Sequence, residues 1–98
     1  MAFELEFTHR ASSDLDALEA DASLEKRLKA VRKALGLLET NPRHPGLSTH
    51  KFVSIKGPNG EEVFEAYAES KTPAAWRIFW MYGPGRNKIT ILAITPHP

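Results

Sequence analysis

The chain has 98 residues, of which 42% are hydrophobic and 26% charged, with a formal net charge of +1 and no cysteine. This composition is that of one small globular domain over residues 1–98, and it excludes disulfide bonds and thiolate metal sites. The first residues lack the bases and apolar stretch of a signal peptide, and no apolar run reaches the roughly 18–20 residues that cross a bilayer. We therefore expect a cytoplasmic protein with no membrane contact.

The first 40 residues predict a strand followed by two helices. Apolar and acidic residues alternate over 3–7, as in a strand with one buried face. The segment 12–22 predicts a short helix, which Ser12 or Ser13 would cap. Leucine and valine recur at steps of four and three over 23–40, which predicts a longer amphipathic helix that stops at Asn41-Pro42. The short connection predicts an antiparallel helix pair.

The rest of the chain predicts an irregular loop followed by strands that are joined by tight turns. The loop covers 41–49, where two prolines and a glycine occur. The expected strands are "HKFVSIK", "EVFEAYAE", "AWRIFWMY" and "ITILAIT". The last two are almost continuously apolar, so we expect them in the centre of the sheet. The predicted fold class is α+β: an N-terminal strand, a two-helix antiparallel hairpin, and a three- to four-stranded antiparallel sheet with one open face.

Arg77 is the one charged residue in "AWRIFWMY". Strand alternation places it opposite the Trp76 side, so it points to the open face if the helices cover Trp76. By the same alternation, Glu65 and Tyr67 lie on that face. Arg77 could grip a phosphate, with Glu65 as a base and Tyr67 stacked on a nucleobase, or it could form a structural pair with Glu65 or Glu69.

A basic run and a terminal histidine are the other candidates. The segment 43–56 contains no acid, and it offers side chains that could bind a polyanion or form a solvated loop: Arg43, His44, His50, Lys51 and Lys56. His97 lies just past the last predicted strand, between two prolines, where it could donate a proton or have no role. The histidines lack the spacing of a metal site, so we expect neither a metal nor a cofactor.

The order of these pieces resembles the RelE/ParE family of type II toxin–antitoxin toxins. "FTHRASSDLDAL" is similar to the first strand and the start of the first helix, and "LEKRLKAVRKALGLLETNPRHPGL" to the second helix and its loop. "SIKGPNGEEVFEAYAE" is similar to the segment before the central strands. "AWRIFWMY" resembles the family's arginine-bearing strand, and "ITILAITPHP" its last strand and tail.

The resemblance implies a bacterial toxin that is neutralised by a cognate antitoxin. In the RNA-cleaving branch, the toxin is a metal-independent, ribosome-associated mRNA endoribonuclease (mRNA interferase). Arg77 then corresponds to the arginine that steadies the scissile phosphate, and His97 to a C-terminal general acid. The general base stays open between Glu65 and a lysine. The expected RNA contacts are Lys51, Lys56, Tyr67, His50 and Arg43. The alternative is a ParE-like or degenerate toxin fold that acts by binding a protein.

Overall fold

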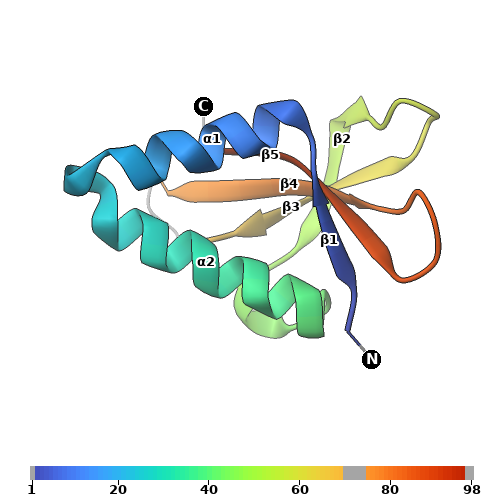
Figure 1. Ribbon diagram of the computed structural model, residues 1–98. Coiled ribbons are helices and arrows are strands. Elements are labelled where there is room, and N and C mark those ends of the chain that lie inside the picture. The colour runs from blue at the N-terminus through green and yellow to red at the C-terminus, as the bar shows by residue number, and fades with distance from the viewer. Residues whose placement is uncertain (1, 70–74, 97–98) are drawn as a thin grey trace.

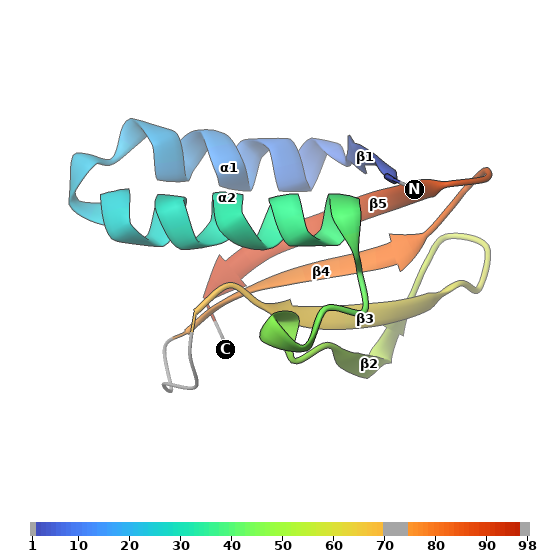
Figure 2. The same cartoon turned by 90° about the horizontal axis from the view of Figure 1, so that it is seen from below.

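Two helices cover one face of a five-stranded sheet (Figures 1 and 2). The computed structural model describes residues 2–69 and 75–96. The elements, in chain order, are β1 (Glu4–Phe7), α1 (His9–Ala20), the 3-10 helix η1 (Ala22–Leu24), α2 (Glu25–Thr40), the 3-10 helix η2 (Pro45–Leu47), β2 (His50–Lys56), β3 (Glu62–Tyr67), β4 (Trp76–Tyr82) and β5 (Lys88–Pro96). The predicted α+β class is confirmed. Within the described part of the chain, no helix is long and apolar enough to cross a membrane.

The strand order is β1-β5-β4-β3-β2, so the two most apolar strands, β4 and β5, are interior as expected. The strands β2 to β5 pair antiparallel, whereas β1 pairs with β5 in parallel. The Lys88 ammonium lies 2.9 Å from a Glu6 carboxylate oxygen across this pair. That hydrogen bond raises the pKa of Lys88 above its ordinary value.

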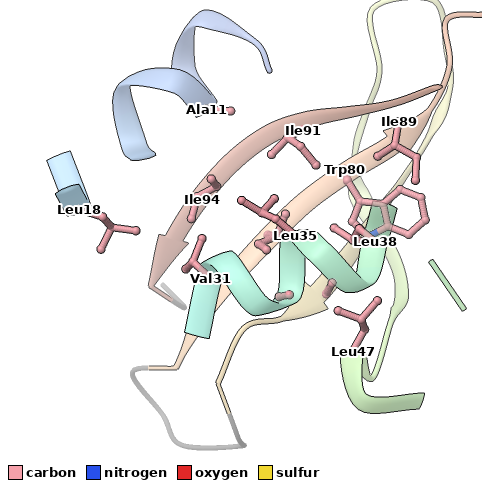
Figure 3. Close-up of a cluster of buried hydrophobic side chains, with 13 residues drawn as sticks. Ala11, Leu18, Val31, Leu35, Leu38, Leu47, Trp80, Ile89, Ile91 and Ile94 are labelled. Carbon is pink, nitrogen blue, oxygen red and sulfur yellow. The ribbon is translucent and has the colours of Figure 1, made fainter. Parts of the chain in front are cut away.

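The core lies between the helices and the sheet. The leucine–valine stripe of α2 supplies Val31, Leu35 and Leu38, and the strands supply alternate residues such as Ile78 and Trp80. Figure 3 shows these α2 side chains directed at the residues of β4 and β5. Burial of each such side chain stabilises the folded state by about 1.5–3 kcal/mol. The contacts with the helices therefore determine which face of each strand points inward.

The first helix begins at His9, earlier than the sequence predicted, because Thr8 caps it. The Thr8 Oγ1 accepts a hydrogen bond from the Ala11 N–H at 3.0 Å. The second helix begins at Glu25, later than predicted, because residues 22–24 form the η1 turn.

A bulge in β5 connects the sheet to α1. Phe79 of β4 pairs with Ala93 and Trp80 with Ile91, which leaves Leu92 as the extra residue. The hydroxyl of Thr8 donates to the Leu92 carbonyl at 3.0 Å. The backbone N–H of Ile94, two residues after Leu92, donates to an Asp14 carboxylate oxygen at 2.9 Å. Side chains from the cap and the first half of α1 therefore satisfy backbone groups at the bulge.

Replacement of Asp14 by alanine should destabilise the protein by about 1–3 kcal/mol, because the partly buried Ile94 N–H loses its acceptor. Urea unfolding would measure the change. Asp16 is exposed on the same helix, so Asp16→Ala is the matched control and should leave stability within about 0.5 kcal/mol. Equal effects of the two replacements would contradict this role of Asp14.

The face of the sheet opposite the helices is less open than the sequence predicted. Phe79 and Met81 of β4 point to this side, yet their exposed fractions are 8% and 2%. The Phe52 ring of β2 packs edge-on against the Phe79 ring with centroids 4.9 Å apart. The Gly57 backbone lies so close to Met81 that an added Cβ would be 2.7 Å from its Sδ. The curled β2 hairpin therefore covers one end of this face.

Candidate functional site

Arg77 lies on β4, on the face turned away from the helices. Its neighbours Ile78 and Trp76 face the helical layer, so the predicted side for Arg77 is the observed one. The side chain is 9% exposed, and its Nη1 donates to a Glu65 carboxylate oxygen at 2.9 Å. The Arg77 Nε is buried and, within the described part of the chain, has no hydrogen-bond partner. The guanidinium is therefore anchored at Nη1, while its Nε–H is enclosed without an acceptor.

Glu65 of β3 joins Arg77 to a third residue. Its side chain is 3% exposed, and its second carboxylate oxygen lies 2.6 Å from the His50 Nε2. The His50 side chain is 49% exposed at the start of β2. Three strands thus bring an arginine, a carboxylate and an imidazole into one row, which we call the Arg77–Glu65–His50 cluster.

Tyr67 covers the cluster. It pairs directly with Arg77 across β3 and β4, and the guanidinium carbon lies 4.3 Å from its ring centroid. That distance is typical of a cation–π contact. The His50 ring centroid lies 5.8 Å from the same ring. The aromatic ring therefore shields the pair from water and also borders the exposed imidazole.

The structure does not bring the lysines of the basic run to this cluster. Lys51 follows His50 on β2 and points to the opposite face, where its Nζ lies 3.2 Å from a Glu62 oxygen. Lys56 ends β2, and Arg43 is exposed in the loop before η2. Of the five predicted RNA contacts, His50 and Tyr67 thus lie at the cluster. The other three, Lys51, Lys56 and Arg43, lie away from it. His97 lies outside the described residues, so its predicted place beside Arg77 stays a prediction.

The contact that sequence reasoning missed is the one between His50 and Glu65. A regular hairpin continued from the observed pair of Lys56 with Glu62 would place His50 opposite Ala68 rather than Glu65. A register shift between Lys51 and Lys56 moves it to Glu65 instead. Because residues 43–56 contain no acid, any carboxylate that contacts His50 has to come from another segment, and this was the available signal.

A separate groove of about 750 Å³ lies between α2, the loop 44–48 and the end of β3. Its floor is apolar, with Ala34, Leu37 and Leu47, and Tyr67 borders it. The groove does not contain Arg77, so it is distinct from the cluster. In residues 2–69 and 75–96, no three histidine, aspartate or glutamate side chains are grouped so that they could hold a metal ion.

Solved structures similar to this one are toxins. A RelE chain in an archaeal RelE–RelB complex from Pyrococcus horikoshii is 14% identical, with TM-score 0.65 over 98% of this chain and 96% of that one. YoeB from Staphylococcus aureus, solved as a dimer, is 15% identical, with TM-score 0.67 over the full length of both chains. This chain has the RelE/ParE toxin fold.

The YoeB/ParE toxin of Agrobacterium tumefaciens has the same RelE/ParE fold, at 8% identity and TM-score 0.70 over 97% of this chain and 99% of that one. The sequence matches no family model. No curated protein matches it either. The RelE/ParE fold is therefore established from the three-dimensional arrangement.

Proposed function

We propose that this protein is the toxin of a type II toxin–antitoxin system and that it cleaves mRNA on the ribosome. The observation that carries the proposal is the position of Arg77 in the RelE/ParE fold. Its guanidinium lies on the sheet face away from the helices, where Glu65 and Tyr67 hold it in a fixed orientation. A guanidinium held in a fixed orientation is suited to a phosphate that gains charge in a transition state.

The proposed reaction forms one P–O bond and breaks another, with one proton removed and one supplied. The 2′-hydroxyl of one nucleotide attacks the adjacent phosphorus, and Arg77 stabilises the charge that builds on the phosphate oxygens. His97 donates a proton to the departing 5′-oxygen. Thr95 pairs with Arg77 across β4 and β5, and His97 follows Thr95 by two residues in the sequence, which supports this assignment.

We also propose a cognate antitoxin as partner, with the cytoplasm as the place of action. The RelE chain that resembles this one was solved with RelB. The groove beside α2 is lined by apolar side chains together with Lys33 and Glu69, so it offers a surface for an apolar segment of such a partner. The proposed RNA contacts are His50 and Tyr67 at the cluster, with Lys51, Lys56 and Arg43 outside it.

The test is primer extension on cellular mRNA after the protein is induced in bacteria. We expect new 5′ ends within translated regions and arrested growth. His97→Ala should slow the appearance of these ends by about 100-fold or more if His97 is the general acid. Full-length mRNA during growth arrest would contradict the endoribonuclease proposal.

One observation favours a second candidate, a ParE-like toxin that acts by binding a protein. Glu65 neutralises Arg77, and Lys51 is paired with Glu62 on the other face, so the cluster is only weakly basic. This candidate predicts intact mRNA together with a DNA-damage response. The same induction experiment, followed by a reporter of DNA damage, separates the two.

A further inference from the structure

Glu65 is not free to take a proton from a substrate. One carboxylate oxygen accepts from Arg77 at 2.9 Å and the other faces the His50 Nε2 at 2.6 Å. The side chain is 3% exposed, so an incoming hydroxyl would meet its partners first. A general base must come within hydrogen-bond reach of the proton that it removes. Glu65 is thus placed to hold other groups.

His50 is the exposed member of the cluster. Its side chain is 49% exposed, in contrast to the 3% of Glu65 and the 9% of Arg77. A carboxylate only accepts hydrogen bonds, so the Nε2 that faces Glu65 must carry a hydrogen. In the neutral imidazole, the lone pair is therefore on Nδ1.

Nδ1 has an acceptor beside it. It lies 3.4 Å from the backbone carbonyl oxygen of Ser48, which can accept from an Nδ1–H but not donate to a lone pair. The other groups near the imidazole are Glu65 and the Tyr67 ring of β3, with Arg77 of β4 behind Glu65. After proton uptake, both nitrogens of His50 would face an acceptor. A carboxylate that orients an imidazole in this way is a known device for general bases.

We propose that His50 is the general base of the cleavage reaction and that Glu65 is a positioning residue; this inference rests on the proposed function. Nδ1 takes the proton of the attacking 2′-hydroxyl while the bond between that oxygen and phosphorus forms. The bond from phosphorus to the 5′-oxygen breaks, and the departing oxygen receives a proton from the general acid. The products are a 2′,3′-cyclic phosphate and a 5′-hydroxyl end, and His50 later releases its proton to water.

The test is single-turnover cleavage of an mRNA on purified ribosomes. His50→Gln should lower the maximal rate at saturating ribosome concentration by about 100-fold or more, a loss separate from any change in mRNA binding. His9 is exposed on α1, so His9→Gln is the matched histidine control and should keep the wild-type rate. Wild-type cleavage together with an unchanged rate in His50→Gln would overturn the inference and leave the proposed function intact. No cleavage by the wild-type protein would remove both.

Two further variants separate catalysis from structure. Added imidazole should restore part of the rate of His50→Ala, whereas a purely structural role would give no rescue. Glu65→Gln keeps an oxygen for Arg77 and turns an N–H toward His50, which reverses the tautomer and moves the lone pair away from Nδ1. We expect its rate to fall as far as that of His50→Gln. A wild-type rate in folded Glu65→Gln, or a nitrogen NMR spectrum showing Nδ1–H in neutral His50, would contradict the assignment.

Discussion

Replacement of Arg77 by alanine is expected to reduce mRNA cleavage by about 100- to 1,000-fold, because the phosphate loses its main charge-stabilising donor. In cells, the same change should abolish growth inhibition. Single-turnover cleavage on purified ribosomes would measure the rate, and plating after induction would measure toxicity.

The controls for Arg77 must distinguish lost chemistry from lost folding, because the guanidinium is also the partner of buried Glu65. Arg77→Lys keeps the positive charge opposite Glu65 but loses the planar fork that can bind two phosphate oxygens. It should stay folded and still lose most of the activity. Arg86 is exposed in the turn before β5, so the control variant Arg86→Ala should remain fully toxic. Full toxicity of Arg77→Ala would refute the role of Arg77 in the proposed reaction.

Replacement of Glu65 by alanine is expected to destabilise the protein by about 3–5 kcal/mol, the cost of leaving a buried charge without its partner. Arg77 is 9% exposed and would lose its carboxylate, and His50 would lose the acceptor for Nε2. Urea unfolding would give the change in free energy. This is the largest loss of stability that we expect from any single replacement in the site.

The matched control is the double replacement Glu65→Leu with Arg77→Met, which removes both charges and keeps similar side-chain volumes. Apolar pairs of this kind often equal or exceed the stability of the buried ion pair that they replace. The double variant should therefore be more stable than Glu65→Ala while being inactive. If Glu65→Ala unfolds at the wild-type urea concentration, the ion pair contributes nothing to the fold.

Local pattern alone determined much of this protein. Alternation in "AWRIFWMY" and "EVFEAYAE" placed Arg77, Glu65 and Tyr67 on one face, and the structure has them there. Successive side chains of a regular strand point to opposite faces because of the backbone geometry, whichever strands pair with it. The leucine stripe likewise predicted which side of α2 is buried. The order of these elements was enough to suggest the RelE/ParE fold that the comparison of structures shows.

Tertiary structure decided which of several equivalent partners each side chain meets. The sequence offered Glu65 or Glu69 as the partner of Arg77. In the structure, Arg77 is paired with Glu65. Glu69 instead accepts a hydrogen bond from the Trp76 N–H at 3.0 Å and lies 3.6 Å from the Arg27 guanidinium. The parallel pairing of β1 with β5 was likewise not visible in local pattern, because strand neighbours are chosen by contacts between distant segments.

The Arg77–Glu65–His50 cluster also depends partly on local sequence pattern and partly on tertiary contacts. Sequence placed His50 on a strand but could not say what it faces, since its partner depends on the register of the β2–β3 pair. The irregular pairing between Lys51 and Lys56 shifts that register and delivers the imidazole to Glu65. The residue types needed for acid–base chemistry are thus a property of the sequence, while their contact is a property of strand register, which only the packed sheet determines.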